Sequence, residues 1–433
     1  MRKYLLIPLL ILPVVIFASS NSFLNLYNSG LNQDPTYQSA NINFIQAQNN
    51  LNSLTSFFVP TLSLTTPSVG LTFNATGLEN STSFLDINLG ILNLYSTTIG
   101  FSLPLNVSNM SFQAPEFSVS RSLIVEDQAD MMQAKSAYSN ALWSIQNTKW
   151  SYLTTLVQNI FNWYYYNQMV NLYTQQVSVL KDVYNSINPE NYTQQNAAYQ
   201  QLLSSQSALA NYQNSLQTIQ PLPNFTPYST QLYQDTMTFV SSITSNFSTD
   251  INVNDVISNR NDVKALQYQY QAYQAQGNLW FLPFIPNPTI TFAVPLNNIS
   301  KWSISLSLNF SLLNGGSNVI QSQQRLTNVQ IGQEELQNAT TTDTLSLNGL
   351  ILKQKSLEIS LTAAQNNVQT ALQAFQTAEA LYKEGLESQD NYTLANLSYQ
   401  ESLLSEQQVQ QQILLNEIQI MQTEGISFGG EGI

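Results

Sequence analysis

Residues 302–312 read WSISLSLNFSL, with an apolar side chain at every even position from Trp302 to Leu312 and Ser or Asn at every odd one. A period of two is typical of a β-strand with one apolar and one polar face. A soluble sheet can also contain such a strand, so the segment alone is ambiguous. Asn314-Gly315-Gly316 ends it, and long Gln-rich helical sequence follows. A strand joined to so long a helix favours a protein that spans a membrane with strands and a compartment with helices.

Composition excludes several classes of protein. Charged residues make up 9% of the chain, against roughly 25% in ordinary soluble domains. The net charge of −13 argues against nucleic-acid binding, which needs basic patches. The chain has no Cys and no His, which removes thiolate nucleophiles, imidazole bases and the common zinc sites. We therefore expect no enzymatic activity, no cofactor and no metal site.

The N-terminus has the three parts of a signal peptide. Arg2-Lys3 is positively charged, residues 4–17 are apolar, and Ala18-Ser19-Ser20 offers small residues for cleavage after Ser20. The alternative, a membrane-anchoring helix, is less favoured because the run is short and contains two prolines. No later stretch approaches 18 consecutive apolar residues, so we expect no membrane-spanning helix.

Alternation and helix periodicity predict the elements. A long Gly-, Asn- and Ser-rich loop is expected up to residue 94, and Pro104 is awkward in a central strand. The expected strands are 57–64, 99–108, 289–294 and 302–312, and the expected helices are 118–185, 191–218, 262–277, 317–384 and a last helix ending near 423.

Two of these helices carry coiled-coil seams, which we interpret as helix-packing positions. In the first, apolar residues recur every seven positions; in the second they follow strict 4-3 spacing. The seam residues are Leu156, Trp163, Val170, Val177 and Tyr184 in the first helix, and Leu357, Leu361, Ala364, Val368, Ala371, Phe375, Ala378 and Tyr382 in the second.

The chain also shows an internal duplication. Residues 191–205 and 391–405 are identical at eight of 15 positions at an offset of 200, with Tyr192/Tyr392 and Tyr199/Tyr399 in register. Each copy predicts a helix, two strands, a long helix and a shorter helix. The predicted organisation is a signal peptide (1–20), a first repeat (21–220), an irregular segment (221–258), a second repeat (259–424) and a flexible tail (425–433).

Four amphipathic strands per chain cannot form a closed barrel alone. Open sheet edges do not occur in lipid, because each unpaired backbone group there costs several kcal/mol. About eight strands make the smallest closed barrel, so two copies are the minimum and three would give twelve strands. The alternative is a soluble sandwich with an aromatic core.

Three motifs carry a family resemblance. Residues 259–263 (NRNDV) resemble "NRPDL", residues 305–316 resemble "LSLSWPLFDGG", and residues 382–396 resemble "RYxxGxxSxLDVLDAQ". All three belong to the TolC-type outer-membrane efflux protein family (outer membrane factors), and through the duplication the resemblance covers nearly the whole mature chain.

The resemblance implies a mixed α+β membrane protein and a homotrimer. Its strands would form one shared twelve-stranded outer-membrane barrel, and its helices a long periplasmic coiled-coil tunnel closed at the tip. The family acts as the passive exit duct of a tripartite efflux pump or a type I secretion system. The implied partners are a periplasmic adaptor protein, an inner-membrane transporter and the lipid of the outer membrane.

The functional residues of the family match this sequence at some positions and differ from it at others. Tyr382 matches the family's gate tyrosine and Gly385 the glycine of the tip turn used in adaptor contact. Glu387 stands where the family has a basic residue, and Asn391 and Leu394 stand where the best-known member has constriction aspartates. We therefore expect a gate held by Tyr382 packing and amide hydrogen bonds, without a cation-binding carboxylate ring.

The candidate tip residues form two groups, and the acids among them could equally be a solvated turn. They are Tyr382, Gly385, Leu386, Glu387, Asp390, Asn391 and Leu394 in the second repeat, and Tyr184, Asn188, Pro189, Glu190 and Asn191 in the first. The competing function is a structural tether between outer membrane and cell wall, with a coiled-coil stalk and no conduit. Single-channel recording separates the two, because a tether should not conduct.

Overall fold

The computed structural model describes 13 segments of the chain: 22–55, 61–65, 71–74, 77–80, 84–94, 97–106, 111–112, 114–123, 126–245, 247–248, 251–285, 288–308 and 316–427. The predicted signal peptide, residues 309–315 of the strand-exit motif and residues 428–433 of the tail lie outside them. No helix among the described residues is both long enough and apolar enough to cross a membrane.

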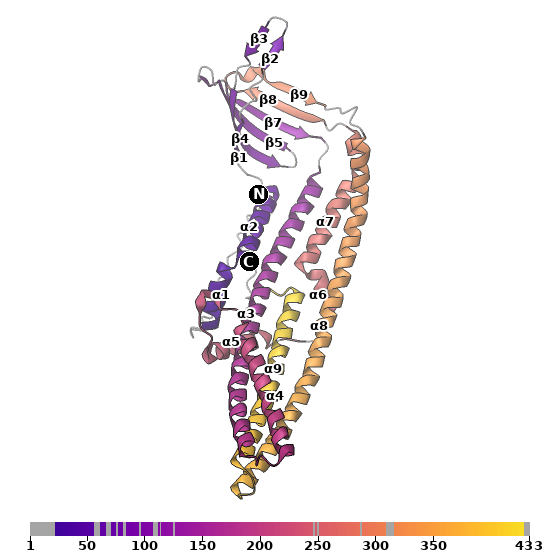
Figure 1. The fold of residues 1–433 in the computed structure, drawn as a ribbon. Coiled ribbons are helices and arrows are strands. Elements are labelled where there is room, and N and C mark those ends of the chain that lie inside the picture. The colour runs from indigo at the N-terminus through magenta and orange to yellow at the C-terminus, as the bar shows by residue number, and fades with distance from the viewer. Residues whose placement is uncertain are drawn as a thin grey trace, which may run out of the picture. The chain divides into compact units, whose positions relative to one another are not determined.

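Helices make up most of the described chain (Figure 1). Their bounds are α1 (Ser22–Gln33), α2 (Pro35–Thr55), α3 (Asp127–Ser186), α4 (Tyr192–Gln217), α5 (Thr230–Thr244), α6 (Val253–Asn259), α7 (Asn261–Asn278), α8 (Ser317–Lys383) and α9 (Gln389–Glu424), with short 3₁₀ turns η1 (Pro223–Phe225), η2 (Leu282–Phe284) and η3 (Ile299–Lys301). The helix predictions at 191–218, 262–277 and 317–384 are confirmed to within a few residues.

The strands are β1 (Thr61–Thr65), β2 (Leu71–Asn74), β3 (Gly77–Asn80), β4 (Phe84–Leu94), β5 (Thr97–Asn106), β6 (Ser111–Phe112), β7 (Glu116–Ser122), β8 (Thr289–Pro295) and β9 (Ser303–Ser307). One antiparallel sheet has the order β1-β4-β5-β7-β8-β9, with the short β6 beside β5, while β2 and β3 form a separate hairpin. All four predicted strands are present, as β1, β5, β8 and β9.

Several sequence expectations were wrong. The predicted loop before residue 94 contains β2, β3 and β4, and the predicted start of the long helix at 118 falls inside β7. Phe117, Val119 and Arg121 alternate with serines, and pairing with β5 and β8 outweighs the absence of helix breakers there. Within the strand predicted over 302–312, the structure has β9 at Ser303–Ser307, and residues 309–312 lie outside the described part of the chain. Segment 221–258 is also more regular than expected, since it contains α5 and α6.

The described chain forms two compact units, each built from several stretches of sequence and from parts of both predicted repeats. The first contains residues 22–34, 152–247 and 356–417, and the second residues 35–151, 248–355 and 418–427. Helices α3, α8 and α9 each contribute to both units. The units therefore do not coincide with the predicted repeat boundaries.

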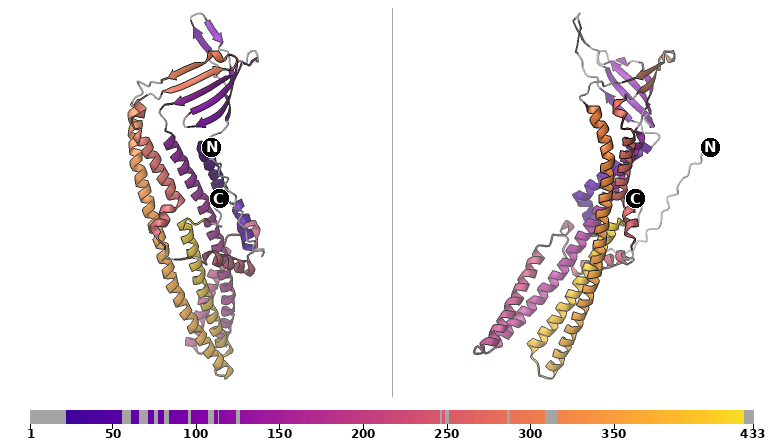
Figure 2. Two further views of the ribbon diagram at one scale, coloured as in Figure 1. Left: turned by 180° about the vertical axis from the view of Figure 1, so that it is seen from behind. Right: turned by 90° about the vertical axis from the view of Figure 1, so that its right-hand side faces the viewer.

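The first unit consists of two helical hairpins with α1 and α5 beside them. The hairpins join α3 to α4 and α8 to α9, and they diverge toward their tips (Figure 2, right). A core of fully buried side chains lies where α1 and α5 pack on α3, and it includes Phe23, Tyr27, Leu153, Phe161 and Val240. Phe23 packs on Phe239 of α5 at 5.0 Å between ring centroids.

The second unit places four helices in a row beneath the sheet. Phe44 of α2 packs on Tyr138 of α3 at 5.6 Å between ring centroids. Asn261 of α7 donates a hydrogen bond to Gln146 of α3. Gly332 of α8 lies against Tyr273 of α7 so closely that a Cβ there would meet the ring at 2.7 Å. The order α2–α3–α7–α8 follows from these contacts.

Candidate functional site

The sheet has one apolar and one polar face over β5, β7, β8 and β9. The register places Ile99 beside Val119, Val119 beside Phe292, and Phe292 beside Ile304, so these side chains form one apolar row across four strands. A second row contains Phe101, Phe117 and Val294, and a third contains Ile290 and Leu306. Serines and threonines at the intervening positions, such as Ser120, Thr291 and Ser305, share the opposite face.

The apolar face is open on β9 and ends in residues suited to a membrane interface. Ile304 is 64% and Leu306 59% exposed. Trp302 lies near Phe292 at 6.3 Å between ring centroids, beside the start of β9. Arg121 is paired with Ile290 in the third row, so it lies at the opposite end of the strands from Trp302. Tryptophan and arginine are typical of membrane–water boundaries.

Both edges of the sheet lack a partner strand among the described residues. The edges are β1 and β9, and each is joined in sequence to one end of the helix row, β1 to α2 and β9 to α8. An exposed sheet edge offers unpaired N–H and C=O groups to another chain.

The tip of the α8–α9 hairpin is built around Gly385, as the sequence predicts. Gly385 has φ +74°. Its N–H donates to the carbonyl of Tyr382, and the N–H of Leu386 donates to the carbonyl of Leu381. This pair of hydrogen bonds is a Schellman motif, which needs a left-handed residue at Gly385. Leu386 is 70% exposed at the turn.

Aromatic rings connect the two helices behind this turn. Tyr382 stacks on Tyr392 of α9 with centroids 5.2 Å apart and planes 13° apart. Phe375, one heptad earlier on α8, contacts Tyr392 and stacks on Tyr399 at 5.9 Å. Two members of the predicted α8 seam, Phe375 and Tyr382, thus pack against α9, and Tyr382 is the last member of the seam.

Polar contacts at the tip combine hydrogen bonds to Glu387 and Ser388 with one exposed ion pair. Asn391 donates from its amide to Glu387 at 2.6 Å, and the Asn391 backbone N–H donates to the hydroxyl of Ser388, which caps α9. Lys383 forms an exposed ion pair with Glu379. Asp390 lies in the first turn of α9, where an acid favours the helix dipole, and Leu394 lies one turn further along.

The α3–α4 tip places the other candidate residues in or beside a turn of the same length, with five residues between the helices at each tip. The backbone N–H of Glu190 donates to the side chain of Asn188, and Asn191 caps α4 by accepting from the Gln194 backbone at 3.3 Å. Pro189 lies between them in the turn. Tyr184 of α3 packs on Tyr199 of α4 at 5.7 Å, so each tip has a tyrosine pair, stacked in one and tilted in the other.

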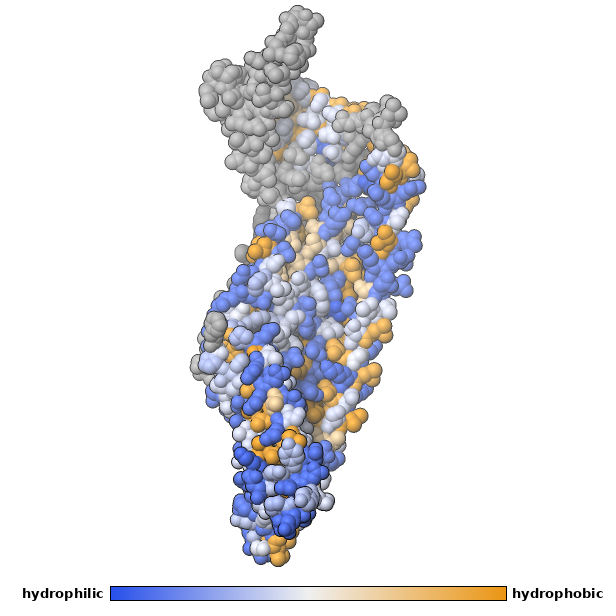
Figure 3. All heavy atoms as spheres, in the orientation of Figure 1, coloured by the Kyte–Doolittle hydropathy of each residue, from blue (hydrophilic) through white to orange (hydrophobic). Residues whose placement is uncertain are grey.

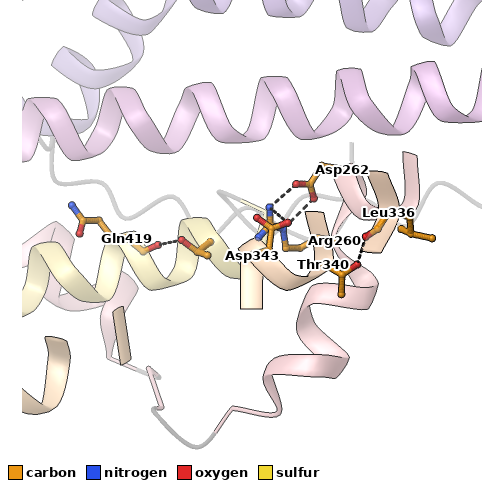
Figure 4. Close-up of polar contacts among 7 residues, drawn as sticks. Arg260, Asp262, Leu336, Thr340, Asp343 and Gln419 are labelled. Atoms are coloured by element: carbon orange, nitrogen blue, oxygen red, sulfur yellow. Dashed lines mark hydrogen bonds and ion pairs between the residues drawn. The ribbon is translucent and has the colours of Figure 1, made fainter. Parts of the chain in front are cut away.

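A buried arginine in the second unit is a feature that sequence reasoning marked only as part of a motif. Arg260 is 6% exposed and lies between α6 and α7. Its guanidinium binds Asp262 through two hydrogen bonds and contacts Asp343 of α8 at 3.2 Å (Figure 4). The guanidinium also stacks over the ring of Trp143 at 4.4 Å. Burial raises the pKa of Asp343, and the attraction of Arg260 opposes that rise.

The end of α9 closes over this arginine. Gly425 has φ +74° and lies against both Arg260 and Trp143. The indole N–H of Trp150 donates to the carbonyl of Ile426 at 2.7 Å, and Gln422 donates to Asn147. We call Arg260, Asp262, Asp343, Trp143 and Gly425 the Arg260 clasp. Its members come from four parts of the chain, so no local pattern predicts it.

The described surface offers grooves but no metal site. A groove of about 440 Å³ between α3 and α7 is lined mainly by Gln, Asn, Ser and Ala, and one of about 250 Å³ between α3 and α9 mainly by Gln, Asn and Leu. No group of three potential metal ligands occurs among the described residues. In Figure 3, hydrophobic residues on the helices are scattered among hydrophilic ones.

Solved structures of outer-membrane channels share this fold. The outer membrane protein VceC of Vibrio cholerae matches 94% of this chain and 97% of its own with a TM-score of 0.56 at 13% identity. The CmeC outer membrane channel of Campylobacter jejuni matches 94% and 86% with a TM-score of 0.54 at 14% identity. The open state of the MtrE outer membrane channel of Neisseria gonorrhoeae matches 94% and 89% with a TM-score of 0.55 at 15% identity.

These likenesses confirm the predicted resemblance at the level of the fold. No model of a protein family matches the sequence, and no curated protein does either. At identities of 13–15% a structural match shows the fold alone. The chain therefore has the fold of outer-membrane channels. Its activity has to be inferred from its own residues.

Proposed function

We propose that this chain is an outer-membrane channel that passively conducts substrates out of the cell, as the exit duct of a tripartite efflux pump or a type I secretion system. The observation that carries the proposal is the two-faced sheet. Its apolar rows suit contact with lipid, and its serine and threonine face suits a water-filled lumen. The predicted signal peptide would direct the chain to the periplasm, where α3, α4, α8 and α9 would form the tunnel.

Closure of the barrel requires further copies, and we propose a homotrimer. The edges β1 and β9 need partners, because unpaired backbone groups are not tolerated in lipid. The helices joined to those edges carry exposed apolar residues that a neighbouring copy would cover. These are Ile42 and Ile45 on α2, and Ile331, Leu345 and Leu352 on α8.

The hairpin tips would be the periplasmic gate. Tyr382 would hold α8 against α9 by stacking on Tyr392, and the Asn391–Glu387 hydrogen bond would hold the turn. A periplasmic adaptor would bind there, using the exposed Leu386 and the Gly385 turn, and an inner-membrane transporter would supply the energy. With Asn391 and Leu394 at the constriction positions, we expect weak block of the channel by multivalent cations.

The alternative function is a structural tether with no conduit. A tether accounts for the long helices and the signal peptide, but it does not need a sheet with a Ser/Thr face opposite its apolar rows. The matched structures are described as outer-membrane channels, which supports a channel over a tether.

One pair of substitutions on β9 tests the membrane assignment. Leu306 lies in an apolar row and Ser307 on the other face. Leu306→Arg should impair insertion into the outer membrane, because an arginine facing lipid costs about 2–4 kcal/mol at the bilayer midplane and up to about 1 kcal/mol near the interface. Ser307→Arg should insert normally and narrow the lumen. Membrane fractionation and release of solutes from reconstituted liposomes measure both effects.

The two variants control for each other, because the same side chain is introduced at adjacent residues that lie on opposite faces of β9. Equal insertion of both variants would contradict the lipid-facing assignment. Normal insertion of the native chain with no solute release would favour the tether.

A further inference from the structure

The sheet contains a hairpin that the helix row does not require. The order of the helices is α2–α3–α7–α8, and the strands joined to them are β1, β7, β8 and β9 respectively. In the sheet, β7, β8 and β9 are direct neighbours, as their helices are. Between β1 and β7, however, lie β4 and β5. The hairpin β4–β5 is therefore inserted in the wall at the position of the α2–α3 pair.

The backbone register shows that this hairpin belongs to the wall. β4 and β5 are paired from Phe84↔Asn106 to Leu94↔Thr97, with an irregularity between Gly90 and Leu92. β4 also pairs with β1 from Thr61↔Gly90 to Thr65↔Asp86. β5 pairs with β7 from Thr97↔Arg121 to Ser102↔Glu116. Pro104 on β5 lies beyond the β7 pairing, where its missing N–H removes no hydrogen bond to β7.

Simple geometry indicates why two additional strands fit. Strands about 4.8 Å apart and tilted by roughly 40° occupy about 6 Å of circumference each. Six such strands cover an arc of about 38 Å, whereas four cover about 25 Å. Four helices packed 8–10 Å apart cover roughly 32–40 Å. A wall of six strands therefore matches the arc of the four helices that continue it.

We infer that each copy contributes six strands, β1, β4, β5, β7, β8 and β9, to the barrel wall, so that a trimer closes on eighteen strands and opens to a wide, water-filled exit. The inference rests on the proposed trimeric channel. Barrel diameter grows roughly linearly with strand number, and barrels of 16–18 strands leave an aqueous channel. The exit would be about 1.5 times as wide as a twelve-stranded one and would admit bulkier solutes.

Engineered disulfides test the strand order directly, because the native chain has no cysteine. Ser63→Cys with Asn88→Cys joins neighbouring positions on β1 and β4, and Thr98→Cys with Ser120→Cys joins β5 and β7. Paired residues on adjacent antiparallel strands lie about 4.5–5.5 Å apart at Cα, within disulfide reach. Both pairs should therefore oxidise in the assembled outer-membrane protein.

The discriminating pair is Ser63→Cys with Ser120→Cys. In a six-stranded wall β4 and β5 separate β1 from β7 by about 14 Å, and the register places Ser63 level with Glu116, four residues from Ser120, so the two positions lie well beyond the roughly 7 Å limit for a disulfide. This pair should stay reduced. If it oxidises while Ser63→Cys with Asn88→Cys does not, β1 contacts β7 directly and the inference is overturned.

The functional consequence is measured by polymer exclusion. Deletion of residues 84–106 removes one whole hairpin, keeps the direction of every remaining strand and leaves the four strands joined to helices. Graded polyethylene glycols added at the outer side should enter the native channel at larger sizes than they enter the deleted one, with open-state conductance lower by about twofold in the variant. Equal size limits would contradict a wider exit. If the variant does not assemble, the disulfide pattern still tests the order of the strands and therefore the inference.

Failure of the inference and failure of the proposed function are separable. Native mass spectrometry gives the copy number, and conductance shows whether there is a channel at all. A channel-forming trimer with the four-strand disulfide pattern would overturn only the inference.

Discussion

Helices α8 and α9 end in the same motif but in different surroundings. Gly385 and Gly425 both have φ +74°, and each is followed by a residue whose N–H donates five residues back, Leu386 to Leu381 and Ile426 to Met421. A Cβ added at Gly385 would meet nothing within 4 Å, whereas a Cβ added at Gly425 would lie 3.2 Å from both Arg260 and Trp143.

The difference shows how a chain with few charges uses them. The Arg260 clasp buries a guanidinium with carboxylates around it, where ion pairing and stacking fix several helices. The tip instead relies on the Tyr382–Tyr392 stack and the Asn391–Glu387 hydrogen bond. We conclude that the clasp provides stability and propose that the tip, with its weaker contacts, is the part that opens.

The largest expected effect follows from removing the arginine. Arg260→Ala would leave Asp262 and Asp343 close together without their cation, and unpairing largely buried charges typically costs about 3–5 kcal/mol. Because both carboxylates keep some solvent contact, we expect about 2–4 kcal/mol, measured by denaturant unfolding in detergent.

Arg260→Lys is the matched control. It keeps the charge but loses the bidentate hydrogen bonding to Asp262 and the stacking on Trp143, so it should recover only part of the stability. Full recovery by lysine would show that charge alone matters there.

The two glycines give the next effect and test the comparison itself. Gly385→Ala should cost about 1 kcal/mol, the usual penalty of a left-handed conformation. Gly425→Ala should cost about 2 kcal/mol, because its methyl group must also displace Arg260 or Trp143. Thermal unfolding of the two variants in parallel measures the difference, and equal losses would contradict the packing contrast.

A smaller change in stability, with a larger change in conduction, is expected at the tip. Tyr382→Ala removes a stacked pair worth about 1 kcal/mol and should increase the open probability in single-channel recordings. Tyr184→Ala, at the tilted pair of the other tip, is the control and should change the open probability less. Identical recordings from both variants would argue against Tyr382 as the gate.

The smallest expected effect concerns the acid dependence of the clasp. Burial raises the folded-state pKa of Asp343 above its ordinary value, so the contribution of this group to stability is present in acid and declines as pH rises through the folded pKa. Asp343→Asn does not titrate, and the stability of the native chain relative to the variant should therefore fall from about pH 4 upward. Melting curves across that range measure it; a relative gain with pH would mean that the Arg260 ion pair dominates.

Much of the fold was predictable because its signals are local. The helix stop at Gly385, the helix start near Asn191 and the alternation of β8 and β9 each depend on a few consecutive residues. β7 was missed because alternation over 116–122 competes with a long stretch free of Gly and Pro, and only neighbouring strands decide between them. The roles of Trp143, Asp343 and Gly425 could not be predicted, since their contact with Arg260 exists only after distant segments fold.

Conduction by the purified protein tests the central claim most directly. The full chain, inserted in planar lipid bilayers at defined copy number, should give discrete single-channel openings that Tyr382→Ala makes more frequent. Correctly inserted, folded protein that passes no current, with or without the Tyr382 substitution, would contradict the channel and favour a tether.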